Sequence, residues 1–187
     1  MSLIDLAPPL VEPIDLAYAK LFMRIDGNAE DALIETLIKT TRHQVENTIG
    51  RTLIRRSFIY RIPVPHGRGI CLPRPPLVSV IRMTLIAEND QAVDIPPSDF
   101  TVSAKKEPGE IRLKSDKNWT DYLAEFTTLE IEFEAGYGDT PDDIPLPLRQ
   151  AIVLLLTHAF EFRETSEAPA IPVIVEALLA PYKTVRL

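Results

Sequence analysis

The spacing of apolar residues changes twice along this chain, and no other feature of the sequence constrains the fold as strongly. Leu33 and Leu37 begin a row of residues at every fourth position, which predicts an amphipathic helix over residues 29–49. Between residues 53 and 135, apolar and polar residues alternate in short runs bounded by proline and glycine, as in strands. Helical spacing returns after Pro145. The chain is therefore predicted to be α+β, with helices on both sides of a β block.

The predicted fold is a helical bundle, formed by N- and C-terminal helices, with a small antiparallel β-sheet or sandwich inserted. We expect one domain, because 187 residues fit one domain better than two. Asp15 suits an N-cap, and Gly50 stands where a left-handed residue commonly ends a helix. The parts are, in order, an N-terminal arm (1–14), helices (15–50), a β insertion (53–135), helices (145–180) and a C-terminal tail (181–187).

Within these parts the predicted elements are short. The arm contains three prolines and shows neither a helical nor a strand period, so it is expected to be ordered only if something holds it. Asn28 with Asp31 resembles a capping pair at the start of the second helix. Helices are expected at 16–23, 29–49, 148–164 and 172–180. Strands are expected at 58–62, 78–87, 92–95, 99–104, 110–114 and 129–135, and residues 70–72 form a short apolar piece.

Composition restricts where the protein works and what it binds. The single cysteine, Cys71, excludes a disulfide within the chain and fits a reducing compartment. No apolar run approaches the roughly 20 residues that span a bilayer, and the N-terminus lacks the features of a signal peptide. We therefore expect a cytosolic protein without contact to a membrane. A net charge of −7 argues against a general affinity for nucleic acids, because phosphate binding depends on a basic surface.

The charges are nevertheless segregated along the sequence. Residues 51–82 contain seven arginines and no acid, and residues 125–148 contain seven acids and no base. The favoured interpretation is that the two segments pair across neighbouring strands of one sheet. The alternative is that they form opposite faces that meet between subunits. Phe58 and Tyr60 between the arginines could also stack on single-stranded nucleic acid, although they are more simply core residues.

Two groups of residues have a spacing that could bind metal. His158 and Glu161 could face one site on a helix, as in carboxylate-bridged metal proteins, but such sites need further ligands. A structural histidine is favoured. Asp139, Asp142 and Asp143 could bind calcium, yet the alternating oxygens and closing glutamate of an EF-hand loop are missing. Capping of the following helix by one of the last two is favoured.

The sequence contains no established catalytic motif. Cys71 could be a nucleophile only with a histidine partner such as His66 and an electropositive pocket, and a partly buried cysteine that acts as a small apolar residue is favoured. Phosphate-binding glycine loops, nucleophile elbows and zinc-protease motifs do not occur. We therefore predict no catalytic residue, no cofactor and no metal, and a role in assembly rather than in chemistry.

Six segments occur in a recognisable order along most of the chain. They are PIDLAYAKLFMRIDGNAEDALIETLIKTTRHQVENTIGRTLI (13–54), LPRPPLVSVIRMTLI (72–86), PSDFTV (97–102), EPGEIRL (107–113), IEFEAGYGDTPDDIPLPLRQAIVLLLTHAFEFRE (131–164) and ALLAPYKTVRL (177–187). Together they resemble the head–tail connector (adaptor) family of tailed bacteriophages, prophages and gene-transfer particles. Each motif alone has low specificity, and their joint order carries the resemblance. Residues 1–12 lie outside it.

The resemblance implies a non-enzymatic structural subunit at the head–tail junction of the virion, made in the cytoplasm of the bacterial host. Such subunits form a ring of about a dozen copies beneath the portal, on which the tail-side stopper sits and through which DNA passes without sequence-specific binding. C-terminal segments of the family are thought to reach the portal, so the expected portal contacts are Tyr182, Lys183, Arg186 and Leu187.

The segregated charges suit a ring in which one face of a subunit meets a different face of the next. The expected contacts between subunits are Arg51, Arg55, Arg56, Glu130, Glu132 and Glu134. Changing Arg55 or Arg56 to glutamate is expected to weaken the ring and leave the fold intact. Two alternatives stay open at this point: another virion assembly protein of similar fold, and a small hydrolase or metal-dependent enzyme that uses His158 and Glu161.

Overall fold

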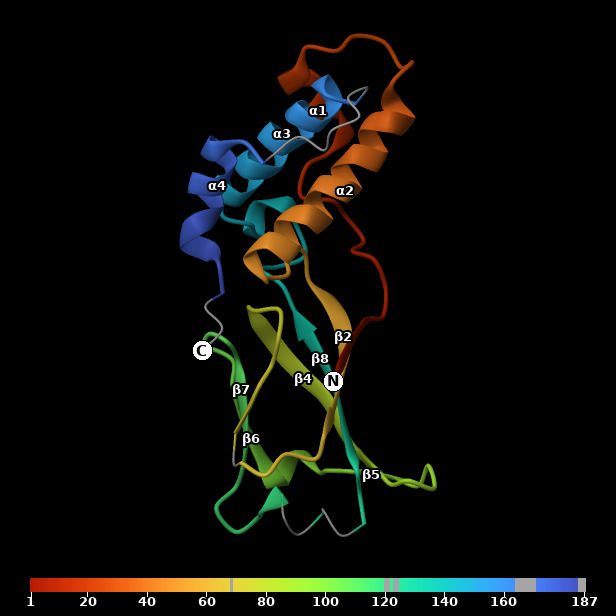
Figure 1. The fold of residues 1–187 in the computed structure, drawn as a ribbon, viewed down its shortest axis with the longest axis vertical. Coiled ribbons are helices and arrows are strands. Elements are labelled where there is room, and N and C mark those ends of the chain that lie inside the picture. The colour runs from red at the N-terminus through yellow and green to blue at the C-terminus, as the bar shows by residue number, and fades with distance from the viewer. Residues whose placement is uncertain (68, 120–121, 123–124, 164–170, 185–187) are drawn as a thin grey trace. The chain divides into compact units, whose positions relative to one another are not determined.

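The computed structural model describes residues 1–67, 69–119, 122, 125–163 and 171–184. The fold class is α+β, as predicted, and Figure 1 shows the helices and the strands in separate parts of the chain. Two compact units result. Met1–Pro9 and Arg55–Gly136 form one, called the β unit here, and Leu10–Ile54 and Tyr137–Leu187 form the other, called the helical unit. The β unit corresponds to the predicted insertion with the first nine residues added.

Two antiparallel sheets build the β unit. The larger sheet has the strand order β1-β2-β8-β4-β5, and the smaller one has the order β3-β7-β6. The strands are β1 (Ser2–Asp5), β2 (Arg56–Pro63), β3 (Gly69–Cys71), β4 (Leu77–Ile86), β5 (Ala92–Asp94), β6 (Phe100–Ser103), β7 (Glu110–Leu113) and β8 (Thr128–Ala135). A short 3-10 helix, η1 (Pro97–Asp99), precedes β6.

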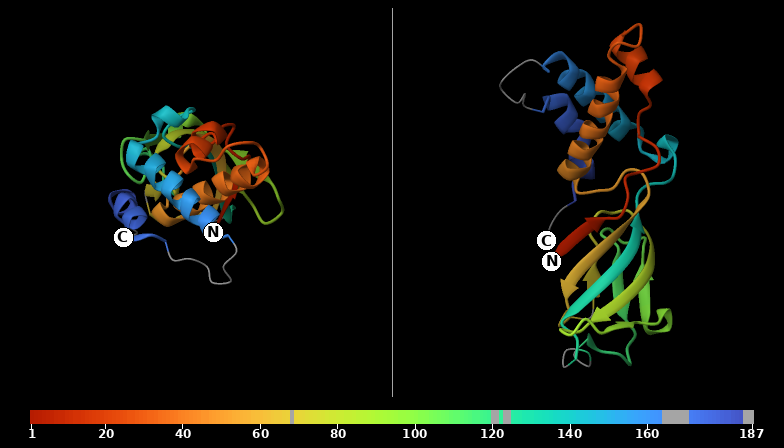
Figure 2. Two further views of the ribbon diagram at one scale, coloured as in Figure 1. Left: turned by 90° about the horizontal axis from the view of Figure 1, so that it is seen from above. Right: turned by 90° about the vertical axis from the view of Figure 1, so that its right-hand side faces the viewer.

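One hydrophobic core fills the space between the two sheets, which lie in two layers (Figure 2). Phe58 of β2 and Phe133 of β8 stack with ring centroids 5.6 Å apart, and Ile111 of the smaller sheet is fully buried in the same core. The alternation predicted for β8 is confirmed, because its apolar residues are buried and its glutamates are only partly so. Each large apolar side chain buried in this way contributes about 1.5–3 kcal/mol to folding.

The N-terminal arm differs from the sequence prediction. Residues 2–5 form the strand β1, which pairs antiparallel with β2 in the register Ser2 to Arg61 and Asp5 to Phe58. Four residues without alternation carry too little signal to predict a strand, and the pairing depends on β2, whose edge supplies the hydrogen-bonding groups. Leu3 packs against the core of the β unit.

The helical unit contains α1 (Leu16–Met23), α2 (Asp31–Ile49), α3 (Leu146–Glu161) and α4 (Val173–Leu179), with 3-10 helices η3 (Pro141–Asp143) and η4 (Ala180–Tyr182). The four α-helices contribute to one core. On α2 the fully buried positions are Ile34 and Ile38, while Leu33 and Leu37 are only half-buried. The predicted stripe was therefore correct in period, but its centre lies one residue further along.

Most predicted helix ends are confirmed, and two caps are not. The Asp15 side chain accepts a hydrogen bond from the Tyr18 backbone N–H, and Gly50 ends α2 in the left-handed conformation. The capping pair predicted at Asn28 and Asp31 is wrong, because the Lys20 ammonium binds both side chains instead. The prediction that an aspartate caps α3 is also wrong. Pro145 occupies that N-cap, and Asp143 closes a capping box with Thr140 at η3.

Candidate functional site

The C-terminal end of α2 binds the C-terminal segment of the chain. The carbonyl of Ile49 belongs to the last turn of α2, where carbonyl groups lack partners within the helix. The backbone N–H and the hydroxyl of Thr184 donate hydrogen bonds to it at 2.9 and 3.0 Å. Arg51 Nε donates to the carbonyl oxygen of Tyr182 at 2.7 Å. We call these four residues the tail contact, and they fix the chain as far as Thr184.

Gly50 makes the tail contact sterically possible. Its φ angle of +71° lies in the left-handed region, where a side chain is strained. A Cβ atom at this position would also lie 3.3 Å from Oγ1 of Thr184. Both the backbone conformation and the close approach of the C-terminal segment therefore favour glycine.

The predicted portal contacts lie at this end of the chain as far as the structure describes them. Tyr182 is half-buried at the end of η4, and Lys183 is exposed. Arg186 and Leu187 lie outside the described residues. Arg51, predicted as a contact between subunits, binds the C-terminal segment within its own chain, and its Nη1 lies 3.5 Å from the hydroxyl of Tyr137.

A buried group of charges lies near the N-terminal part of the helical unit, and the sequence analysis did not find it. Arg42 Nη1 donates to Glu46 at 3.0 Å, and Arg42 Nε donates to Glu12 at 2.7 Å. The second oxygen of Glu46, whose side chain is fully buried, accepts the backbone N–H of Leu53 at 2.9 Å. The only available signal was the spacing of four residues between Arg42 and Glu46. The group fixes Glu12 and Leu53 to α2.

The acidic and basic segments meet across the strands of the larger sheet. Arg61 Nε lies 2.5 Å from an oxygen of Glu130, with which it is in register, and Arg82 lies 3.4 Å from Glu132. Glu134 accepts a hydrogen bond from the Ser79 hydroxyl. Pairing across neighbouring strands is thus confirmed for two arginine–glutamate pairs. The arginine side chains stay about half exposed, at 49% and 54%, so they also keep area that a neighbour could contact.

The remaining two predicted contacts between subunits differ in accessibility. Arg55 is half-buried. The Arg56 side chain is only 5% exposed, forms an ion pair with Asp5 at 2.8 Å and lies over the ring of Phe58. In this setting a glutamate at position 56 is expected to destabilise the fold, because it would place an acid at a buried position beside Asp5.

The residues considered as metal ligands or as a nucleophile do not form a site for either chemistry among the described residues. The His158 ring lies against Phe162, with centroids 4.7 Å apart, and its Nε2 is buried without a hydrogen bond to the described residues. Glu161 is exposed, Asp142 pairs with Arg149, and Cys71 is exposed rather than partly buried. Across the described residues, no three His, Cys, Asp or Glu side chains are grouped so that they could hold a metal ion.

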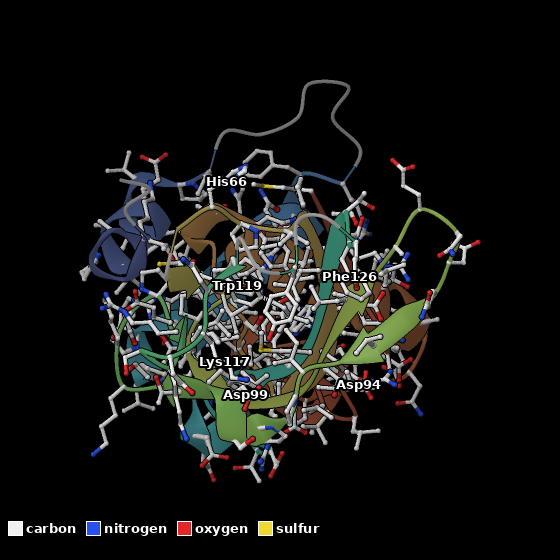
Figure 3. All side chains as sticks on the ribbon, turned by 90° about the horizontal axis from the view of Figure 1, so that it is seen from below. His66, Asp94, Asp99, Lys117, Trp119 and Phe126 are labelled. Atoms are coloured by element: carbon white, nitrogen blue, oxygen red, sulfur yellow. The ribbon has the colours of Figure 1, made fainter. Side chains whose placement is uncertain are left out.

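Two ionisable side chains in the β unit, Lys117 and Glu110, have shifted pKa values. The hydrogen bond from Lys117 to Asp99, and the negative charge of that carboxylate, raise the pKa of Lys117 (Figure 3). Hydrogen bonds from Lys106 and Arg112 lower the pKa of Glu110. Each is explained by an ion pair within the strand and turn region, so neither requires a ligand. Within the described residues no helix is both long and apolar enough to cross a membrane.

Three chains in solved structures have a fold similar to that of this chain. A chain from a virion of a native gene transfer agent (GTA) particle matches with a TM-score of 0.83 and 22% identity. A chain from the neck of an empty GTA particle, computed with C6 symmetry, matches with a TM-score of 0.82 and 22% identity. A third, from the neck of a native GTA particle computed with C12 symmetry, gives 0.77 and 20%. All three matches cover 100% of this chain and 97% of the other.

The fold is thus similar to that of chains in gene transfer agent particles. Residues 13–91 match the family model described as phage gp6-like head-tail connector protein. This match confirms the predicted resemblance to head–tail connectors over that part of the chain. No curated protein sequence matches this chain.

Proposed function

We propose that this chain is the subunit of a ring at the head–tail junction of a phage, prophage or gene-transfer particle, where it joins the portal to the tail-side stopper. The match of residues 13–91 to the connector family carries this proposal. It is supported by the likeness of the whole chain to neck proteins, one of them in a structure computed with C12 symmetry. The ring would contain about a dozen copies, assembled after synthesis in the bacterial cytoplasm. Each copy would act as one connector domain, with a bundle of terminal helices and an inserted β module.

DNA would pass through this ring without being bound by its sequence. A channel in which DNA slides should not hold phosphate groups tightly, and a net charge of −7 lowers that attraction. A gel-shift experiment at low salt tests this point. The protein should not retard duplex DNA, whereas a salt-dependent shift would indicate a phosphate-binding surface.

Contacts between neighbouring copies would be heterologous, with the outer side of the larger sheet meeting a different face of the next copy. This side presents Arg61 and Arg82, about half exposed, with Glu130, Glu132 and Glu134 between them. Arg55 would contribute from the start of β2. Arg51 would act indirectly, because it holds the C-terminal segment of its own chain. Arg56 would act through its ion pair with Asp5 of β1.

The portal would bind the C-terminal residues that follow the tail contact. Tyr182 and Lys183 lie beside the end of α2, where Arg51 and Thr184 hold the backbone. Arg186 and Leu187 would extend from this fixed point. The anchoring lowers the conformational entropy that docking has to overcome, because the chain is already ordered up to Thr184.

Co-sedimentation with the portal protein of the same particle tests this function. Wild-type protein should sediment with portal rings, and a chain truncated after Thr184 should lose most of that binding while keeping its far-UV circular dichroism spectrum. A Lys105→Ala variant, changed in an exposed turn of the β unit, is the matched control and should bind like wild type. Equal binding of the truncated chain would refute the role of the C-terminal residues. Absence of binding by wild type would refute the connector function.

A further inference from the structure

The N-terminal strand β1 belongs to the β unit, while the chain from Leu10 to Ile54 belongs to the helical unit. The chain passes from one unit to the other at Pro9–Leu10, again at Ile54–Arg55, and a third time at Gly136–Tyr137. The last two passages are joined by a backbone hydrogen bond from Tyr137 to Leu53. The first is made by residues 6–11, which we call the crossing segment.

The crossing segment is fixed at both ends by ion pairs. Before it, Asp5 binds the buried Arg56 at 2.8 Å, and after it, Glu12 binds the buried Arg42 at 2.7 Å. Between these two points the apolar side chains are exposed, with Leu6 at 45%, Leu10 at 100% and Val11 at 40%. A segment that is anchored on both sides yet presents apolar residues to solvent is typical of chain that a neighbour covers.

The sequence of the crossing segment also favours an extended path. Pro8 and Pro9 fix their own φ angles near −65° and hold the preceding residues in extended conformations. Six residues in such a conformation span at most about 20 Å. An extended connection resists folding back tightly on itself.

We propose that, in the assembled ring, β1 of each copy pairs with β2 of the neighbouring copy instead of with its own. The exchange preserves every contact of β1, because an identical β2 edge and an identical Arg56 are offered by the neighbour. It additionally places the crossing segment between two copies, where Leu6, Leu10 and Val11 lose contact with water. The inference rests on the proposed ring and specifies which segment links its subunits.

The ion pair between Arg56 of β2 and Asp5 of β1 makes the pairing of these strands specific. Asp5 forms an ion pair with the buried Arg56 when β1 lies in its observed register. Leu3 of the same strand packs against the core of the β unit, so a register shift by one residue would remove both contacts. A peptide of other sequence would lack both the acid that pairs with Arg56 and the apolar residue that packs against this core. The edge of β2 therefore fits β1 of a second copy of this chain.

Chemical cross-linking between subunits tests the exchange. Ile4 and Ile59 are partners in the register of β1 and β2, and Cys71, the single cysteine, is exposed and can be changed to serine in all variants. One preparation carries Ile4→Cys and a second carries Ile59→Cys. The two are mixed, assembled with the portal and treated with a short bismaleimide. Neither chain can cross-link internally, so any product joins two copies.

We expect the mixed ring to yield a band at the mass of two chains on a denaturing gel, and rings of either variant alone to yield single chains. A mixture of Ile86→Cys and Ala92→Cys chains is the matched control, because β4 and β5 are joined by a short hairpin turn and should give no product. If Ile59→Cys impairs folding, Ser2→Cys with Arg61→Cys offers a second pair in the same register.

The outcomes separate this inference from the proposed function. Rings that form but give only single chains would overturn the exchange and leave the connector function standing. A protein that forms no rings with the portal present would overturn both. Cross-linked dimers from the mixed ring, together with single chains from the unassembled mixture, support the exchange.

Discussion

Loss of the Arg42 side chain should strongly weaken the helical unit. Its guanidinium is the cation between Glu12 and Glu46, and the Glu46 side chain is fully buried. Removing one partner of a buried ion pair costs about 3–5 kcal/mol, because the remaining charge stays in a poorly solvated position. Arg42→Ala leaves two acids without this cation, so we expect a loss of stability in that range.

The part of this loss of stability that comes from the missing charge can be separated from the effect of shortening a long side chain. Glu46→Gln removes the charge but keeps an oxygen that can accept the hydrogen bond of the Leu53 N–H. The double variant Arg42→Ala/Glu46→Gln should therefore be more stable than Arg42→Ala alone, by roughly 1–2 kcal/mol. Lys39→Ala, at an exposed position of the same helix, should change stability by less than about 0.5 kcal/mol.

Urea unfolding followed by circular dichroism at 222 nm measures these differences, because that signal reports the helices. The reasoning predicts a large decrease in the midpoint for Arg42→Ala and partial recovery in the double variant. If Arg42→Ala unfolds at the same urea concentration as Lys39→Ala, or if the double variant is less stable than the single one, the charge argument is wrong.

Three further predictions concern separate parts of the molecule. Gly50→Ala should lower the thermal midpoint by a few degrees in a melting scan, since its left-handed backbone and the nearby Thr184 hydroxyl both resist a Cβ; the cost is about 1–2 kcal/mol. For Glu110, whose pKa is lowered by Lys106 and Arg112, ionisation stabilises the fold above the unfolded-state pKa and this contribution is lost as pH falls through the folded-state pKa. The stability difference between wild type and Glu110→Gln should therefore shrink in acid, and a constant difference would contradict this. Arg61→Ala should cost less than about 1 kcal/mol in monomer unfolding, because the ion pair is half exposed, and a larger loss would show that the pair is structural.

Periodic patterns in the sequence predicted the regular elements well. The alternation in β8 and the four-residue spacing in α2 correspond directly to which side of the element is buried, so local sequence was sufficient. The caps at Asp15 and Gly50 were also predicted, because each depends on one residue and its nearest neighbours.

Features that depend on distant residues could not be predicted in the same way. β1 forms because β2, more than fifty positions later, offers an edge and a buried arginine. The tail contact joins residues 49 and 184, and the ion pair of Glu12 with Arg42 joins an arm to a helix. Asp31 failed as a cap for the same reason, since Lys20 from another helix binds it. Residues distant in the sequence determine these contacts, so the local sequence pattern does not predict them.

The separation of basic and acidic segments in the sequence predicted which strands pair, but not which arginines are accessible. It identified the strands that pair, because Arg61 and Arg82 lie beside β8 in register with its glutamates. It did not distinguish arginines that stay accessible from Arg56, whose side chain is buried beneath Asp5. Burial of a long charged side chain depends on what covers it, which is a property of the assembled fold.

The mass of the complex formed with the portal tests the connector account most directly. Light scattering coupled to size-exclusion chromatography should show that portal rings gain the mass of about a dozen copies of this 21.0 kDa chain. A protein that elutes at the mass of one chain, with the portal peak unchanged in mass, would contradict the account.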